Sequence, residues 1–93
     1  MTKAVEWSVE YTATARRQLR KLDRNDALRI LDFMDQRIAP GRTPRDTGKA
    51  LTGAALGAYW RYRVGDFRVI CDMQDGKLCV LVVQIGNRRE VYR

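Results

Sequence analysis

Arginines cluster in the second half of this 93-residue sequence at spacings that suit a phosphate ester. Arg61 and Arg63 precede the dipeptide Gly65-Asp66, and Arg68 follows it. The guanidinium of arginine is a planar, permanently charged fork of donors that binds phosphate bidentately and can stabilise a pentacoordinate phosphorane. RNA carries its own nucleophile, the 2′-hydroxyl. The arginines therefore favour phosphoryl transfer on RNA.

Such a reaction also needs a base for the hydroxyl and a group that offsets charge on the leaving oxygen. Tyr92 is the best candidate for the base, because neighbouring cations lower the pKa of a phenol; the alternative is an apolar anchor for the C-terminal tail. Arginine is a poor general acid, although it can offset leaving-group charge. Tyr59, close to Arg61, could stack on a base; the alternative is packing on the sheet.

Composition limits the classes of protein and partner. Ninety-three residues predict a single domain, 1–93, and 45% hydrophobic with 31% charged residues is typical of a globular chain. Eighteen Lys and Arg against eleven Asp and Glu leave a net charge of +7. This excess favours a polyanionic partner such as nucleic acid, an acidic protein or an anionic membrane. The alternative is a basic protein that is merely soluble.

Several kinds of chemistry are disfavoured by what the sequence lacks. With no histidine, His-based acid–base catalysis and His-ligated metals are excluded, and two cysteines are too few for a disulfide scaffold or a four-ligand zinc site. We expect no cofactor and no metal. No apolar run approaches the roughly 20 residues that span a bilayer. Residues 1–10 lack an apolar signal core, so we expect a cytoplasmic protein without a membrane partner.

Hydrophobic periodicity predicts the elements that position these residues. Strict alternation over Val5–Tyr11 predicts a half-buried strand, and Thr12 suits the N-cap of a helix that ends near Leu22. A second helix runs from its cap at Asp23 to Pro40-Gly41, and a basic loop covers 41–57. Three strands follow at about 58–64, 67–74 and 77–85. The order β-α-α-β-β-β predicts an α+β domain, with a helical hairpin packed on one face of a mostly antiparallel sheet.

Two-residue turns at Gly65-Asp66 and Asp75-Gly76 would set the register of the last three strands. One face is then almost wholly apolar and should be covered by the helices: Trp60, Tyr62, Val64, Phe67, Val69, Cys71, Met73, Leu78, Val80 and Val82. The other face holds Tyr59, Arg61, Arg63, Arg68, Ile70, Asp72, Cys79, Leu81, Val83 and Ile85. The two cysteines lie on opposite faces, so a disulfide is not expected.

This register places Arg63 directly opposite Arg68, with Arg61 diagonally nearby. Like charges in opposed positions destabilise a hairpin, so the fold gains nothing from them, whereas a phosphate site requires them. The alternative is a solvated polar face on which Asp66, Asp72 or Glu90 neutralises part of the charge.

Taken together, three runs resemble the RelE branch of the RelE/ParE toxin superfamily: Gly48–Gly53 (GKALTG), Tyr59–Cys71 (YWRYRVGDFRVIC) and Ile85–Tyr92 (IGNRREVY). The segment Leu19–Asp23 fits as well, so the resemblance spans essentially the whole chain. It implies a small toxin that enters the ribosomal A site and cuts mRNA by 2′-hydroxyl attack, without metal, leaving a 2′,3′-cyclic phosphate. It also implies a cognate antitoxin, which we expect to be acidic.

The resemblance assigns the family's functional residues to Arg61, Arg68, Arg88 and Tyr92. Two positions depart from it. Tyr59 stands where some members carry lysine, with Arg63 and Lys49 as plausible substitutes, and Asn87 stands where many carry histidine. Further basic residues should contact ribosomal RNA or message: Arg16, Arg17, Arg20 and Lys21 on the first helix, and Arg42, Arg45 and Lys49 in the loop.

Two alternatives stay open at this point. A toxin of the ParE kind shares the fold but inhibits DNA gyrase without chemistry, and a basic RNA-binding module would have no activity. The joint presence of Arg61, Arg68, Arg88 and Tyr92 favours the endonuclease.

Overall fold

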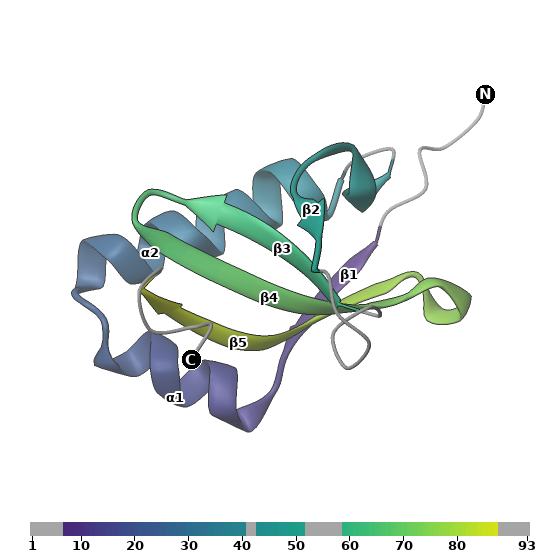
Figure 1. The fold of residues 1–93 in the computed structure, drawn as a ribbon. Coiled ribbons are helices and arrows are strands. Elements are labelled where there is room, and N and C mark those ends of the chain that lie inside the picture. Colours follow the sequence, from purple (N-terminus) through teal and green to yellow (C-terminus); the bar gives the residue numbers. More distant parts are fainter. Residues whose placement is uncertain (1–6, 41–42, 52–58, 88–93) are drawn as a thin grey trace.

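The computed structural model describes residues 7–40, 43–51 and 59–87 of the chain. Five strands form one sheet in the order β1-β5-β4-β3-β2, with bounds Ser8–Tyr11 (β1), Lys49–Ala50 (β2), Tyr59–Val64 (β3), Phe67–Gln74 (β4) and Cys79–Asn87 (β5). β1 pairs with β5 in parallel, and the other neighbours are antiparallel (Figure 1). The predicted α+β class and mostly antiparallel sheet are confirmed.

Two helices form the second layer. α1 (Ala13–Lys21) begins where predicted, because the Thr12 side chain accepts a hydrogen bond from the Ala15 backbone N–H at 3.1 Å. α2 (Arg24–Phe33) starts after Asp23 and continues into a π-helical turn over Met34–Ile38. A single element was expected over this span. The turn ends where the Ala39 N–H donates to the carbonyl of Met34.

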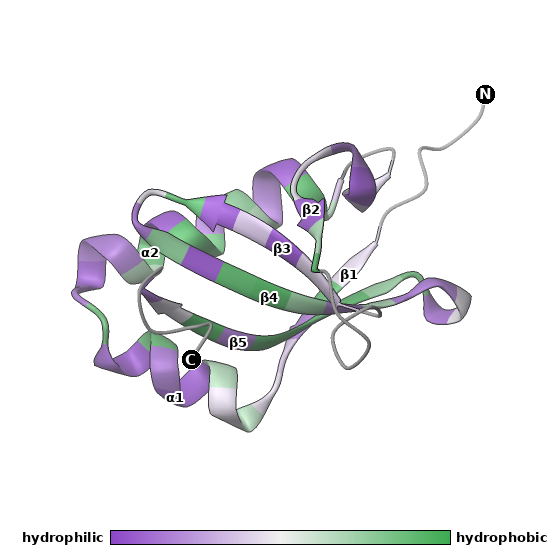
Figure 2. Cartoon of the chain, viewed as in Figure 1, coloured by the Kyte–Doolittle hydropathy of each residue, from purple (hydrophilic) through white to green (hydrophobic). Residues whose placement is uncertain are grey.

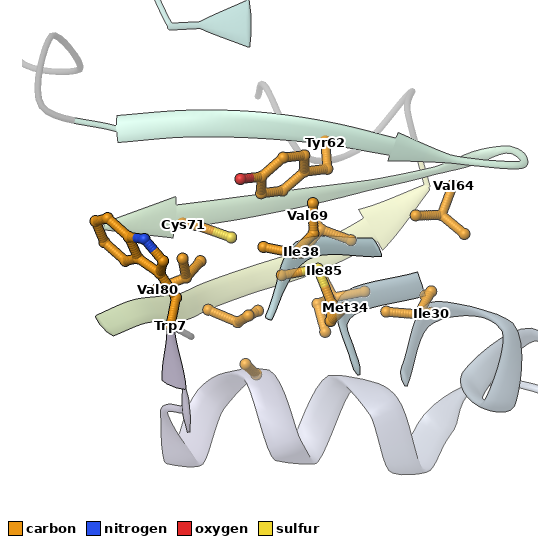
Figure 3. Close-up of a cluster of buried hydrophobic side chains, with 12 residues drawn as sticks. Trp7, Ile30, Met34, Ile38, Tyr62, Val64, Val69, Cys71, Val80 and Ile85 are labelled. Carbon is orange, nitrogen blue, oxygen red and sulfur yellow. The ribbon is translucent and has the colours of Figure 1, made fainter. Parts of the chain in front are cut away.

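The core lies between the helices and one face of the sheet (Figure 3). The strands contribute residues of the predicted apolar face, Tyr62, Val69, Cys71, Val80 and Val82, and the helical layer contributes Ala15, Ile30, Met34 and Ile38. In Figure 2 hydrophobic and hydrophilic residues alternate along both helices, and hydrophilic bands interrupt the mostly hydrophobic β4. The opposite face of the sheet, which carries Arg61 and Arg63, is called the open face below.

The β3–β4 hairpin has the predicted register. Val64 pairs with Phe67, Tyr62 with Val69 and Trp60 with Cys71 across the Gly65-Asp66 turn. Gly65 adopts φ +60°, the left-handed conformation that this short turn requires. This hairpin is therefore fixed by local turn chemistry.

The β4–β5 register differs from the prediction. The turn is a four-residue loop, in which Asp75–Lys77 form a 3-10 turn and the Leu78 N–H donates to the Asp75 carbonyl at 3.1 Å. Met73 therefore pairs with Val80, and Leu78 is 42% exposed and not in the core. The prediction of a two-residue turn at Asp75-Gly76 was wrong.

A β-bulge shifts the pairing once more. Cys71 pairs with Val82 while Ile70 pairs with Gln84, so Val83 is an extra residue on β5. Beyond the bulge the inward and outward positions exchange, and Ile85 is a core residue with 2% exposure instead of a residue of the open face. Cys71 and Cys79 are both buried and not disulfide-bonded, as expected.

Candidate nucleic-acid interface

Strand β3 performs two tasks with alternate residues. Trp60 and Tyr62 point to the helix side, where Tyr62 is fully buried, and Arg61 and Arg63 occupy the open face. Because successive side chains of a strand point to opposite faces, the residues that anchor this strand are interleaved with its cations. The positions of Arg61 and Arg63 are thus fixed by the packing of their neighbours.

The basic loop is held against β3 from the helix side. The Tyr62 hydroxyl donates a hydrogen bond to the Pro44 carbonyl at 2.6 Å, and the Trp60 Nε1–H donates to the Thr47 carbonyl at 2.7 Å. Burial raises the pKa of the Tyr62 phenol, so it remains a donor at neutral pH. These contacts bring the short strand β2 beside β3, with Lys49 paired to Arg61. The sequence did not predict this strand.

Gly48 permits that close approach. Its φ of +86° is a left-handed conformation, and a Cβ there would lie 2.6 Å from Trp60 Nε1 and would also clash with the Arg61 carbonyl. No other residue type fits between the loop and β3 without displacing one of them. Gly48 and Thr47 were not predicted as site residues. The signal in the sequence was the glycine directly before Lys49, in the run that also carries the family resemblance.

Arg45 forms a second anchor for the loop. Its guanidinium makes a bidentate ion pair with Asp75, at 2.9 and 3.1 Å, and lies 5.9 Å from the centre of the Trp60 ring. The hydrogen bond to Arg45 lowers the pKa of the Asp75 carboxyl. Arg45 was predicted to contact RNA; the structure gives it a structural partner, and its role toward RNA stays a prediction.

A pocket of about 260 Å³ opens where the loop meets β3. Among the described residues it is lined by Thr47, Gly48, Lys49, Arg61 and Arg63, of which three are cations. Arg68 pairs directly with Arg63 from β4 on the same face. The predicted cationic face is therefore present, and Lys49 joins it through β2. Such a concentration of donors is suited to a phosphate.

Beside the cations, the open face carries a small apolar cluster. Leu51 and Ile70 are buried, and Tyr59 and Val83 pack against them. Asp72 pairs with Tyr59 across β3 and β4, and the Gln74 side-chain amide donates to the Asp72 carboxylate at 3.2 Å. The open face thus has a cationic end and an apolar end.

The remaining predicted residues do not meet at this pocket. Four cations are on α1, in the helical layer on the other side of the sheet, and all four are exposed: Arg16, Arg17, Arg20 and Lys21. Lys21 lines a separate groove of about 220 Å³, together with Gln18, Leu22 and residues of β4 and β5. Arg42, Arg88 and Tyr92 lie outside the described residues.

Within residues 7–40, 43–51 and 59–87, no three His, Cys, Asp or Glu side chains are grouped as metal ligands. In the same segments, neither helix has the length and apolarity to cross a bilayer.

Two helices packed on a five-stranded, mostly antiparallel sheet form the α+β fold of the RelE-like toxins. Comparison with known proteins supports that class. The model of a family described as ParE toxin of type II toxin-antitoxin system, parDE, matches residues 9–92. Toxin RelG of Mycobacterium tuberculosis is 28% identical over 87 residues, which cover 94% of this chain and 97% of that protein.

Solved structures of toxins share this fold. The toxin–antitoxin complex RelBE2 of M. tuberculosis contains a chain with a TM-score of 0.81 and 27% identity, over 97% of this chain and 100% of that one. The archaeal RelE–RelB complex of Pyrococcus horikoshii gives 0.67 with 21% identity, over 92% and 99% of the two chains. The isolated Escherichia coli RelE toxin gives 0.60 with 19% identity, over 92% and 90%. This chain belongs to the RelE/ParE superfamily of type II toxins.

Proposed function

We propose that this toxin is a ribosome-dependent endoribonuclease that cuts mRNA in the A site. The observation that carries the proposal is the pocket in which Lys49, Arg61 and Arg63 converge, with Arg68 opposite Arg63. Guanidinium and ammonium groups from β2, β3 and β4 together offer a single phosphate several charged donors. The pocket is open and small, as a site for one phosphodiester of a single strand should be.

In the proposed reaction, the 2′-hydroxyl of the message attacks the adjacent phosphorus. Its proton passes to the Tyr92 oxygen. The bond from phosphorus to the 5′-oxygen breaks with its electron pair on that oxygen, which takes a proton from water, and a 2′,3′-cyclic phosphate remains. Arg61 and Arg68 bind the scissile phosphate, and Arg88 stabilises the charge that develops. Since the sequence has no histidine, rate enhancement depends on charge stabilisation and on orientation of the hydroxyl by the ribosome.

The exposed arginines of α1 have a different role in this proposal. Arg16, Arg17 and Arg20 are on the helical layer, away from the pocket, so they would bind the backbone of ribosomal RNA. Lys21, Arg42 and Arg45 complete the basic surface that we expect to meet the ribosome. In this proposal, binding to the ribosome and cleavage of the mRNA depend on different residues.

The partner that restrains the toxin should be an acidic antitoxin. A net charge of +7 and a cationic open face favour one, and two of the similar structures are toxin–antitoxin complexes. We expect it to cover the sheet or the helical hairpin, and either to neutralise the arginines or to displace the C-terminal tail. A toxin that is harmless when expressed alone and co-purifies with nothing would contradict this expectation.

Toeprinting on programmed ribosomes tests the activity. Purified toxin should produce new stops within A-site codons, and Arg61→Gln should abolish them. Lys77→Gln is the matched control, because Lys77 carries the same charge on the exposed β4–β5 turn, outside the pocket. Stops that persist in Arg61→Gln would remove Arg61 from the site.

A second candidate is inhibition of DNA gyrase, which the match to a ParE family model favours. The two functions give different products. Gyrase-linked DNA breaks without toeprint stops would support inhibition of gyrase and overturn the endonuclease proposal.

A further inference from the structure

Asp72 is an acid on a face whose neighbouring cations suit a polyanion. A carboxylate there repels phosphate, so it weakens the site unless it contacts a part of the ligand that donates hydrogen bonds. In RNA the donors are the bases and the 2′-hydroxyls. The surroundings of Asp72 point to a base.

Tyr59 lies directly opposite Asp72 across β3 and β4, so the two side chains project from the same face. The tyrosine is partly exposed and packs on Leu51 and Ile70, which fix its position. Arg61 follows Tyr59 by two residues on the same strand, a separation of roughly 7 Å. A nucleotide whose phosphate lies by Arg61 can therefore place its base on Tyr59.

Gln74 completes a pattern of hydrogen-bonding groups. Its Nε2 donates one hydrogen to Asp72 Oδ2 at 3.2 Å, and an amide nitrogen carries a second hydrogen. The pair thus presents two acceptors followed by one donor, namely Oδ1, Oδ2 and Nε2–H. The Watson–Crick edge of guanine presents the complement, with donors at N2 and N1 and an acceptor at O6. Adenine, cytosine and uracil do not present two adjacent donors.

We propose that Tyr59, Asp72 and Gln74 form a guanine-binding subsite next to the phosphate pocket, with the base stacked on Tyr59 and its edge on Asp72 and Gln74. This inference rests on the proposed RNA-binding function and adds a base preference to it. The preference is a property of the toxin and so should be present without the ribosome.

Binding of short RNAs tests the subsite. Oligoribonucleotides that differ at one base are 2′-O-methylated, so that they cannot be cut, and their affinities are measured by fluorescence anisotropy. Wild-type toxin should bind guanine about tenfold more tightly than adenine, in the range expected of a bidentate contact. Inosine, which lacks the N2 donor, should be intermediate. Tyr59→Leu should weaken all the RNAs together, because stacking is indifferent to base identity.

Asp72→Asn should abolish the preference for guanine. Asp66→Asn is the matched control, since it removes the same charge from the exposed β3–β4 turn and should leave the preference intact. Persistence of the preference in Asp72→Asn, or its absence from the wild type, would overturn the subsite while leaving the endonuclease proposal standing. Failure of the wild type to bind any RNA, on or off the ribosome, would overturn both.

Discussion

Arg63 and Arg68 pair directly across the β3–β4 hairpin, two guanidinium groups in opposed positions on one face of the sheet. The pair follows from the two-residue turn at Gly65-Asp66, and its neighbours Val64 and Val69 are buried in the core. Register is therefore fixed by turn and core, and the hairpin cannot slip to separate the charges.

Removing one of the two charges should impair the toxin with little effect on the fold. Arg63→Gln should lower cleavage on the ribosome and change the free energy of unfolding by no more than about 1 kcal/mol, the upper end of the range for cross-strand pairs. Denaturant unfolding and single-turnover cleavage measure the two effects. Lys77→Gln, on the exposed β4–β5 turn, is the control for a general loss of positive charge. Cleavage at the wild-type rate in Arg63→Gln would remove Arg63 from the site.

Sequence reasoning succeeded where a local signal sets the structure. The cap at Thr12, the Gly65-Asp66 turn and the strand periodicity act over a few residues, and each was found. It failed where the outcome depends on distant contacts. The bulge at Val83 and the four-residue loop ending at Leu78 depend on how β5 packs in the sheet. The residue types near them in the sequence do not predict either feature.

The same distinction applies to the candidate site. Arg61, Arg63 and Arg68 share a face because of strand alternation and one turn, which a sequence displays. Lys49 reaches that face through two hydrogen bonds from Trp60 and Tyr62 to carbonyls of a loop. Every residue has a backbone carbonyl, so the residue types do not indicate which carbonyls accept these hydrogen bonds. The pocket wall at Thr47 and Gly48 therefore could not be predicted.

Removal of one hydroxyl group tests the assignment of Tyr92 as the general base. Tyr92→Phe keeps the ring and removes the hydroxyl, so single-turnover cleavage on a programmed ribosome should fall by about 10²-fold or more, with ribosome affinity nearly unchanged. In a pH series the wild-type rate should rise with pH as the base loses its proton, and the variant should lack that rise. Cleavage at the wild-type rate with the same pH profile would make Tyr92 a packing residue. Arg88→Ala should also cut slowly and relieve toxicity in cells.

The arginines of α1 should act on binding alone. Arg16→Ala with Arg17→Ala should weaken binding to the ribosome, while cleavage of message that is already bound stays intact. The slope of log affinity against log salt concentration should become shallower by about two, because two phosphate contacts are lost. Both residues are exposed, so the fold should be unaffected. Arg24→Ala with Lys77→Ala removes the same charge from other exposed positions. Equal effects of the two double variants at physiological salt would remove Arg16 and Arg17 from the interface.

Two buried phenols should respond differently to loss of the hydroxyl. Tyr62 donates to the Pro44 carbonyl, so Tyr62→Phe leaves an unpaired acceptor and should cost about 1–3 kcal/mol of unfolding free energy. The Tyr11 hydroxyl is buried and has no hydrogen-bond partner among the residues that the structure describes, so Tyr11→Phe should be neutral or stabilising. Burial raises the pKa values of the Tyr11 and Tyr62 phenols above the ordinary 10. Their contribution to the free energy of unfolding is therefore fully present below pH 10, and it is lost at higher pH, where the unfolded chain ionises more readily than the folded one. Each phenylalanine variant should lose part of that alkaline decline, which urea unfolding at pH 8 to 11 measures. An unchanged decline in both variants would show that neither phenol is buried in solution.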